Sequence, residues 1–239
     1  MFLTCCLNGV RQRSEHPALP ITPLELARDV ARVVAAGADA VHIHAKHHAG
    51  SDTLDPAILS AALSAIRADS PGLPVGTTTG EWTETEPGSR LAAIARWTVL
   101  PDFASVNWHE PGAESIAAAL MARGVGVEAG LWTIDAVRTW AASPLRDRCI
   151  RVLVELGEGL SASETVAEGD RIVDAVRAFL DSGAPPILLH GQGSSTWPAL
   201  RHAAALGLQG RIGLEDVLTL PDGRPAADNA ALVVAARAR

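Results

Sequence analysis

The sequence contains no tyrosine, only three cysteines and only 4% aromatic residues in its 239 positions. Without tyrosine, no phenol is available as an acid or a base in a reaction. Cys5 and Cys6 are adjacent within an apolar run and Cys149 stands alone, so there is no CxxC pair. This cysteine usage argues against a zinc ribbon, a thiol redox enzyme and a disulfide-rich secreted protein.

Runs rich in lysine or arginine are also missing, and no apolar run is long enough to cross a membrane. The formal net charge is −7 at pH 7, so the electrostatic footprint of a nucleic-acid or anionic-membrane protein is absent. The N-terminal apolar run has neither a basic flank nor a cleavage site, which is not typical of a signal peptide. We therefore expect a cytoplasmic protein with no nucleic-acid or membrane partner.

Apolar residues make up 48% of the sequence and form strand-like and helix-like segments that alternate regularly. The segment 22–37 is typical of the helices: it begins with Thr22-Pro23, a helix cap and first-turn proline, and ends at Gly37. Strands that alternate with helices indicate parallel pairing. Eight such units in about 240 residues are what a (β/α)8 barrel requires. A doubly wound open sheet is the alternative, but no Gly-rich phosphate turn follows the first strand.

We therefore predict an α/β fold, a single-domain (β/α)8 TIM barrel that covers residues 1–239. The predicted strands cover residues 3–9, 40–45, 74–80, 103–108, 125–132, 150–156, 186–191 and 210–216. The predicted helices cover residues 22–37, 56–69, 88–97, 112–124, 133–142, 161–183, 195–207 and 227–239.

Functional residues of such a barrel lie at the C-terminal ends of its strands, and polar residues gather there in this sequence. His42 and His44 are two residues apart on the second strand and therefore point to the same face. Closure of the barrel brings the eighth strand near the second, so Glu215 can reach the same space. Two histidines and one carboxylate form the ligand set of catalytic zinc, with positions left for water or substrate. Iron(II) accepts the same ligands.

Each of these residues also has a structural interpretation. The two histidines can form a hydrogen-bonded pair in the core, and Arg211 can form an ion pair with Glu215 within the barrel. Glu128 lies within an apolar strand, where an unpaired carboxylate is costly, so it is either functional or a hydrogen-bonding anchor. His190, at the end of the seventh strand, is a site residue or a core histidine.

The strand-end residues resemble those of the β-keto acid cleavage enzymes, the family that includes 3-keto-5-aminohexanoate cleavage enzyme. The combination of LPxTP, HxH and RxGxED is specific, and the matching segments keep the family's order over nearly the whole chain. These segments are 8-NG-9, 17-PALPITPLELA-27, 37-GADAVHIHAK-46, 78-TTG-80, 104-ASVN-107, 127-VE-128, 211-RIGLED-216 and 227-ADNAALV-233.

This resemblance implies a zinc-dependent barrel in which a β-keto acid and acetyl-CoA give acetoacetate and a new acyl-CoA. By motif match, the zinc ligands would be His42, His44 and Glu215. Arg211 and Asp216 would form the pair linked to proton abstraction. The residues implied to line the substrate site are Glu128, Thr78, Ser105 and Asn107.

Elementary chemistry refines these implied roles. Arginine stays protonated in proteins, so we favour Arg211, braced by Asp216, as a stabiliser of developing negative charge rather than a base. Glu128 is the simpler proton carrier if burial raises its pKa.

Several positions depart from the family's pattern, and two of them bear on substrate binding. Arg11 follows the first-strand glycine by two residues, where the amine-cleaving relative has an acidic residue. A cationic side chain there favours a neutral or anionic substrate tail over an amine. Lys46 stands where arginine is common and is a candidate contact for a phosphate of CoA.

Other functions use similar residues. An amidohydrolase-type metal-dependent hydrolase also has HxH in a barrel, but on its first strand, with metal histidines on strands five and six. Here those strands offer Glu128 and Glu155. A non-catalytic barrel that binds acyl-CoA or metal would not need all of Arg211, Glu215, Asp216 and Glu128. We favour the enzyme and expect it to form a homo-oligomer.

Overall fold

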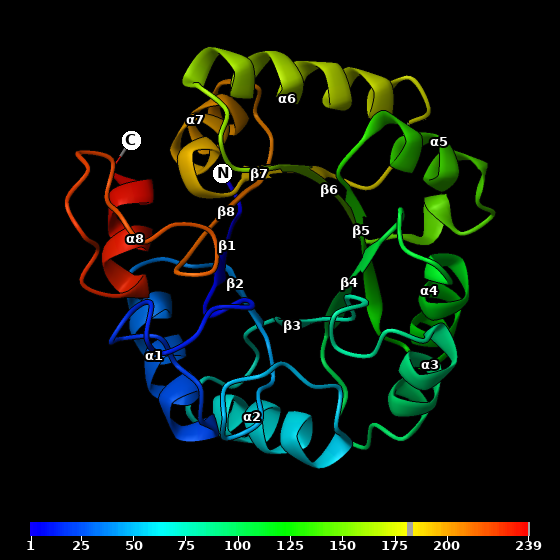
Figure 1. Cartoon of the computed structure of the whole chain (residues 1–239), viewed down its shortest axis with the longest axis vertical. Coiled ribbons are helices and arrows are strands. Elements are labelled where there is room, and N and C mark those ends of the chain that lie inside the picture. Colours follow the sequence, from blue (N-terminus) through cyan, green and yellow to red (C-terminus); the bar gives the residue numbers. More distant parts are fainter. Residues whose placement is uncertain (181–183, 239) are drawn as a thin grey trace.

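Eight parallel strands form a central barrel and eight α-helices surround it (Figure 1). The computed structural model describes residues 1–180 and 184–238, and the counts refer to these residues. The strands are β1 (Leu3–Cys6), β2 (Ala40–Ile43), β3 (Val75–Thr78), β4 (Phe103–Asn107), β5 (Gly126–Leu131), β6 (Arg151–Leu156), β7 (Ile187–Gly191) and β8 (Gly210–Ile212).

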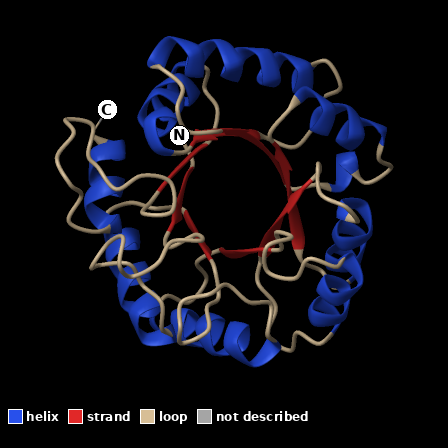
Figure 2. Cartoon of the chain, viewed as in Figure 1, coloured by secondary structure: helices blue, strands red, loops and turns tan. Residues whose placement is uncertain are grey.

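Each strand is followed by a helix that packs outside the barrel (Figure 2). Two short 3₁₀ helices, η1 (Arg146–Arg148) and η2 (Gly193–Ser195), precede β6 and α7. Among the helices of the described residues, none is long and apolar enough to pass through a membrane. The α-helices are α1 (Pro23–Ala35), α2 (Pro56–Asp69), α3 (Pro87–Ala95), α4 (Ala113–Ala122), α5 (Ile134–Ala142), α6 (Ala162–Arg177), α7 (Thr196–Ala205) and α8 (Asn229–Arg237).

The strands pair in the order β7-β6-β5-β4-β3-β2-β1-β8. The two ends of this order meet through a parallel bridge between Leu188 and Gln209. The Leu189 amide donates to the Gln209 carbonyl and the Gln209 amide donates to the Ile187 carbonyl, both at 3.0 Å. These bonds close the ring, so the predicted (β/α)8 TIM barrel is confirmed.

Alternation along the strands separates the hydrophobic core from the barrel interior. Val41 and Ile43 of β2 belong to the core cluster, which includes residues of the surrounding helices. His42 and His44, at the alternate positions, line a cavity at the end of the barrel. The period of two predicted from the sequence therefore directs both imidazoles into the same space.

Local capping explains where the helices begin. The Thr22 hydroxyl accepts a hydrogen bond from the Glu25 amide, and the Glu25 carboxylate accepts one from the Thr22 amide, forming a capping box. Pro23 then occupies the first turn, where no intrahelical donor is lost. At the start of α2, before Pro56, the Asp55 carboxylate accepts hydrogen bonds from the amides of Ala57 and Ile58. These signals were readable in the sequence.

Some predicted elements are longer than the observed ones. The strand predicted for residues 3–9 ends at Cys6, and the strand predicted for 210–216 ends at Ile212. The helix predicted for 161–183 ends at Arg177, and residues 181–183 lie outside the described part of the chain. The helix predicted for 227–239 covers Asn229–Arg237. Residue 239 also lies outside the described part of the chain.

The early end of β8 positions the site. A Cβ on Gly213 would lie 1.9 Å from the Cys6 carbonyl oxygen, so only glycine fits where the chain turns against β1. The amides of Asp216 and Val217 donate to the Gly213 carbonyl at 2.9 and 3.0 Å, which makes a turn instead of a longer strand. Glu215 and Asp216 therefore stand on a turn that crosses the end of β1.

A buried side chain on α8 holds this turn. Asn229 accepts a hydrogen bond from the Leu214 amide at 2.7 Å and donates to the Leu7 carbonyl at 2.9 Å. The same amide group donates to the Asp29 carboxylate on α1 at 2.7 Å. Asn229 thus joins the turn after β8, the end of β1 and two outer helices.

Replacement of Asn229 tests this connection. Asn229→Ala leaves an amide, a carbonyl and a carboxylate buried without this partner, and each such loss costs about 1–3 kcal/mol. We expect the free energy of unfolding in urea to fall by about 2–4 kcal/mol. The control, Val234→Ala, changes a side chain of the same helix that is 56% exposed, and should change stability by less than about 0.5 kcal/mol. Equal effects of both changes would contradict the assignment.

Candidate active site at the C-terminal ends of the strands

A cavity of about 210 Å³ opens at the C-terminal ends of the strands. It is lined mostly by polar side chains from the strand ends and from the loops that follow them. The predicted site residues in its wall are Arg11, His42, His44, Thr78, Ser105, Asn107, Arg211 and Glu215. Three other predicted residues, Lys46, Glu128 and Asp216, are buried nearby but outside this wall.

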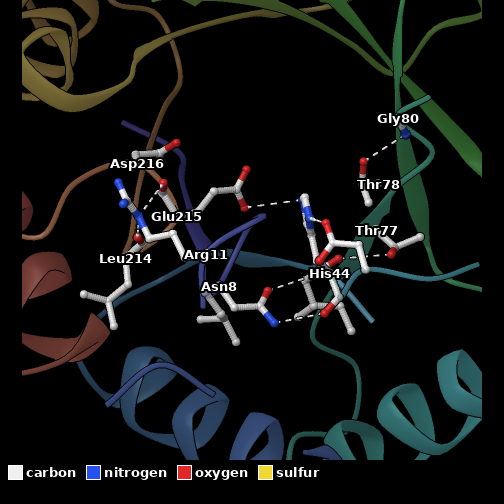
Figure 3. Close-up of polar contacts among 12 residues, drawn as sticks. Asn8, Arg11, His44, Thr77, Thr78, Gly80, Leu214, Glu215 and Asp216 are labelled. Carbon is white, nitrogen blue, oxygen red and sulfur yellow. Dashed lines mark hydrogen bonds and ion pairs between the residues drawn. The ribbon is translucent and has the colours of Figure 1, made fainter. Parts of the chain in front are cut away.

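The two histidines and Glu215 come together as a candidate metal site. One ligand atom from each of His42, His44 and Glu215 lies within 4.8 Å of the others. The imidazole centroids of His42 and His44 are 5.3 Å apart, and Nε2 of His44 is 3.8 Å from Oε2 of Glu215 (Figure 3). Oε2 of Glu215 is buried and accepts no hydrogen bond from the described residues. An unpaired buried carboxylate oxygen facing two imidazoles fits a divalent cation.

Local electrostatics keep His42 and Glu215 free of protons. Burial lowers the pKa of His42 to about 3, although the charge of Glu215 opposes this shift. Burial by itself raises the pKa of Glu215, but Arg211, His44 and His42 outweigh it and hold this pKa well below its usual range. Neutral imidazole and ionised carboxylate are the forms that bind a metal.

His44 is held from two sides. Its backbone amide donates to Oδ1 of Asn8 at 2.8 Å, and Nδ2 of Asn8 donates to the His44 carbonyl at 2.9 Å (Figure 3). Nδ1 of its ring lies 2.6 Å from Oδ2 of Asp52. Burial raises the pKa of Asp52, but bonds and charges from His44 and Lys46 outweigh this and lower it.

Asp52 is a residue that the sequence interpretation missed. The signal for it is general: a histidine that binds metal usually donates its second ring nitrogen to a carboxylate. An acidic residue in the loop after the HxH strand was therefore a candidate.

Arg211 is buried between two carboxylates. Its Nη2 donates to Oε1 of Glu215 and to Oδ1 of Asp216, both at 2.6 Å. Burial alone would lower the pKa of Arg211, but the charge of Asp216, with smaller contributions from Cys6 and Glu215, raises it well above its usual value. Arg211 is therefore a permanent cation in the cavity wall, as expected for a stabiliser of negative charge.

Asp216 lies behind Arg211 and not in the cavity wall. Its side chain is fully buried, and Nδ1 of His190 is 3.8 Å from its Oδ1. Burial raises its pKa, while the charges of Arg211 and His190 oppose the shift. This geometry agrees with a residue that braces Arg211.

Glu155 and His190 form a pair that the sequence did not assign to the site. Oε2 of Glu155 lies 3.0 Å from Nε2 of His190, and Glu155 is part of the cavity wall. Burial raises the pKa of Glu155 to about 7, although Arg211 opposes this. Burial and the charge of Arg211 lower the pKa of His190 to about 3. A carboxyl group that titrates near neutrality is suited to proton transfer.

Glu128 and Lys46 are engaged away from the cavity. Glu128 forms a buried ion pair with Arg151, whose Nε donates to Gln209 at 2.6 Å. Burial raises the pKa of Glu128 and Arg151 opposes the shift. Lys46 forms a buried ion pair with Asp52. The substrate contacts expected of Glu128 and Lys46 stay predictions, and the geometry does not bring either side chain to the cavity.

The remaining predicted residues line the cavity from β3 and β4, the two strands that follow β2 in the barrel. Thr78 and Ser105 are register partners on β3 and β4, and the Thr78 hydroxyl accepts a bond from the Gly80 amide at 3.1 Å (Figure 3). Asn107 donates to Glu110 at 2.7 Å and accepts from Nε1 of Trp132 at 3.2 Å. The orientation of the Asn107 amide is therefore fixed by its neighbours.

Arg11 lines the cavity with its charge already paired. Its Nε donates to the backbone carbonyls of Leu214 at 2.6 Å and Glu215 at 3.2 Å (Figure 3). Its Nη1 donates to Glu15 at 2.8 Å, and Glu15 also lines the cavity. The sequence predicted that Arg11 lies at the site but did not predict its pairing with Glu15.

The raised pKa of Glu155 predicts a pH-dependent stability difference. An acid whose pKa is about 7 when folded and about 4.3 when unfolded binds its proton more tightly when folded, so rising pH destabilises the native protein. Glu155→Gln removes this effect. In metal-free protein, its gain in unfolding free energy should rise from near zero below pH 4 to about 3–4 kcal/mol above pH 8. Urea unfolding at several pH values measures it, and a constant difference from pH 5 to 8 would oppose it.

Solved structures with a similar fold include three forms of one protein, ObcA. The apo form matches with a TM-score of 0.75 and 18% sequence identity, over 93% of this chain and 61% of that chain. Binary and ternary complexes, described with oxaloacetate and with a C4-CoA adduct and oxalate, match with TM-scores of 0.71 and 0.69. At 18% and 17% identity, both over 93% of this chain and 63% of that chain, these likenesses show the fold.

Comparison with known sequences identifies the family of this chain. A curated relative, the 3-keto-5-aminohexanoate cleavage enzyme of Fusobacterium nucleatum subsp. nucleatum, is 31% identical over 81 residues. That match spans 34% of this chain and 30% of the relative. The pattern of the beta-keto acid cleavage enzymes (BKACE) matches residues 1–239. Since the match extends over all of these residues, the resemblance inferred from the motifs is confirmed, and this chain belongs to the beta-keto acid cleavage enzyme family.

Proposed function

We propose that this protein is a zinc-dependent enzyme that condenses a β-keto acid with acetyl-CoA and cleaves the product to acetoacetate and an acyl-CoA. One observation carries this proposal: the ligand set of His42, His44 and Glu215 shares a small cavity with the buried cation Arg211. Zinc is the metal favoured by two imidazoles and one carboxylate with open positions.

The proposed reaction balances without an oxidant or reductant. A proton leaves the methylene group between the keto and carboxylate groups, and the resulting carbanion attacks the thioester carbon of acetyl-CoA, releasing the CoA thiolate. The thiolate then attacks the original keto carbon and the bond from that carbon to the former methylene breaks. The products are the acyl-CoA of the tail and the acetoacetate carbanion, which takes back one proton.

The residues of the cavity have different roles in the proposed reaction. His42, His44 and Glu215 would hold zinc, which supplies Lewis acidity at the oxygens of the keto acid. Arg211 carries a positive charge in a site of low dielectric, so it stabilises negative charge that develops on the substrate. Asp216 holds the Arg211 guanidinium in place from behind.

Proton transfer requires a group that titrates near neutral pH and faces the substrate. Glu155 has a pKa of about 7 and lines the cavity, so we assign the proton to its carboxyl group. Nε2 of His190 hydrogen-bonds Oε2 of Glu155 and so orients that carboxyl group. The proton-carrier role expected of Glu128 stays a prediction, because its carboxylate is paired with Arg151 outside the cavity wall.

Polar residues of β3 and β4 are suited to orient the substrate. Thr78, Ser105 and Asn107 present hydroxyl and amide groups to the cavity that the metal ligands line, where they can hydrogen-bond a carboxylate or carbonyl oxygen. At the entrance side, Arg11 and Glu15 offset each other's charge. This pairing favours a neutral tail, the first of the two classes that the presence of Arg11 suggested.

The comparisons support the coarse assignment. The curated relative cleaves a β-keto acid by its name, and ObcA was solved with oxaloacetate and with a CoA adduct. The strand ends do not favour an amidohydrolase, since β5 and β6 contribute Glu128 and Glu155 and no histidine. A cytoplasmic location and a homo-oligomer stay predictions.

Product formation measured together with metal content tests this function. Purified protein would be offered acetyl-CoA with neutral, anionic and cationic β-keto acids, while free acetoacetate is followed and zinc is measured on the same sample. We expect acetoacetate from at least one acid with bound zinc, and loss of both in His44→Ala because one ligand is removed. A zinc-loaded protein that forms no acetoacetate from any acid would contradict the cleavage function. Turnover by metal-free protein would contradict the role of zinc.

Charge pairing at Arg11 predicts a change in substrate preference. Arg11→Leu frees the Glu15 carboxylate, so kcat/KM for an amine-tailed acid relative to a neutral-tailed acid should rise about tenfold, or about 1.4 kcal/mol. The matched control is Arg13→Leu, whose guanidinium pairs with Glu25 at the surface and should leave the ratio unchanged. A wild-type preference for the amine-tailed acid, unaltered in Arg11→Leu, would refute the argument from charge.

A further inference from the structure

One carboxylate collects three donors beside the candidate metal site. Oδ2 of Asp52 lies 2.6 Å from Nδ1 of His44 and accepts from Nε1 of Trp82 at 2.9 Å. Oδ1 of Asp52 accepts from the ammonium group of Lys46. The side chain of Asp52 is only 5% exposed, so these three donors replace its water.

We propose that Asp52 is a positioning residue of the metal centre, which sets the tautomer and orientation of His44, and that Lys46 balances the charge of Asp52. This inference rests on the proposed metal site and deepens it. It concerns how strongly His44 binds a metal through its ring nitrogen, which neither the motifs nor the comparisons describe.

The first step of the argument is the tautomer of His44. An ionised carboxylate can only accept hydrogen bonds, so the ring nitrogen at 2.6 Å from Asp52 must carry the hydrogen. In the neutral imidazole, the form that binds a metal, the lone pair is then on Nε2, which faces Oε2 of Glu215 at 3.8 Å. A partner on Nδ1 therefore presents the correct nitrogen to a metal, and its negative charge strengthens the bond that Nε2 would make to a cation.

Trp82 limits the movement of the ring. Its side chain stacks on His44 with ring centroids 6.0 Å apart and an angle of 19° between planes. A Cβ on Gly80 would lie 2.1 Å from the Trp82 ring, so the glycine after β3 leaves the space in which this indole lies. Trp82 thus donates to Asp52 and packs on the histidine that Asp52 orients.

Lys46 is the only lysine in the sequence, whereas arginine occupies every other basic position apart from histidines. Its side chain is fully buried, and its ammonium also donates to the Gly50 carbonyl at 3.2 Å. A compact ammonium fits a carboxylate oxygen and one carbonyl, while a guanidinium fork needs a wider set of acceptors. Lys46 therefore neutralises part of the charge that Asp52 presents to His44.

This arrangement gives two variants opposite effects. Asp52→Asn removes the negative charge behind His44, so zinc should bind about 10–100-fold more weakly, the usual effect of losing such a partner. Lys46→Met keeps the carboxylate and removes the opposing charge, so the Kd for zinc should equal or fall below the wild-type value. A cluster that is merely structural would weaken zinc binding in both variants.

The test is zinc affinity, measured by competition with a chromophoric chelator, for the full-length wild type and both variants. Weaker binding in Asp52→Asn with equal or tighter binding in Lys46→Met supports the proposal. Wild-type affinity in Asp52→Asn, or a tenfold weaker affinity in Lys46→Met, would overturn it. Because Asp52→Asn leaves a buried ammonium unpaired and can fail to fold, the double variant Asp52→Asn/Lys46→Met is measured too. Its zinc affinity should also fall about 10–100-fold.

A second readout does not involve zinc. Imidazole ¹⁵N chemical shifts of metal-free protein distinguish the two tautomers, and His44 should carry its hydrogen on Nδ1 in the wild type and in Lys46→Met. The double variant should lose this preference. A His44 that carries its hydrogen on Nε2 in the wild type would overturn the proposal. This measurement also separates the two hypotheses, since a wild type that binds no zinc would refute the proposed function while the tautomer result stands.

Discussion

The contact between the turn after β8 and the end of β1 is the constraint on which the site depends. Gly213 packs directly on the Cys6 carbonyl, and the Glu215 amide donates to that carbonyl at 3.2 Å. A side chain at position 213 would separate the two segments. Because they touch, Glu215 extends across β1 to the imidazoles that β2 presents. Closure of the barrel thus unites residues that are more than 160 positions apart in the sequence.

The site also contains two clusters of buried charged side chains. Arg211, Glu215 and Asp216 lie within hydrogen-bonding distance in the barrel, and Asp52 and Lys46 form a second buried pair beside them. Burying charges is costly unless partners satisfy them, and such clusters are weak evidence for added stability. A function in the site explains the presence of these buried charges more readily than a contribution to stability does. Oε2 of Glu215 accepts no hydrogen bond from residues 1–180 or 184–238, and a cation between it and the histidines would complete the balance.

Much of this architecture was predictable from the sequence. Alternating strands and helices indicated the barrel, the period of two in His42 and His44 indicated one face, and closure of the barrel indicated that Glu215 reaches the same space. These inferences succeed because strand periodicity and barrel closure are set by the backbone.

Other features depended on side-chain packing between distant loops. Asp52 and Glu155 entered the site because loops and neighbouring strands brought them to His44 and His190. Lys46 was expected to meet a phosphate but lies buried against Asp52, and Glu128 lies against Arg151. The sequence shows which residues are charged, but the partner of each buried charge is fixed only when the tertiary structure forms.

The central claim is that a zinc ion binds between β2 and the turn after β8. Anomalous X-ray diffraction from zinc-loaded crystals, recorded on both sides of the zinc absorption edge, tests it most directly. The account predicts one strong peak about 2.0–2.2 Å from a nitrogen of His42, Nε2 of His44 and an oxygen of Glu215. A cavity without such a peak, or a peak bound only by other residues, would contradict it.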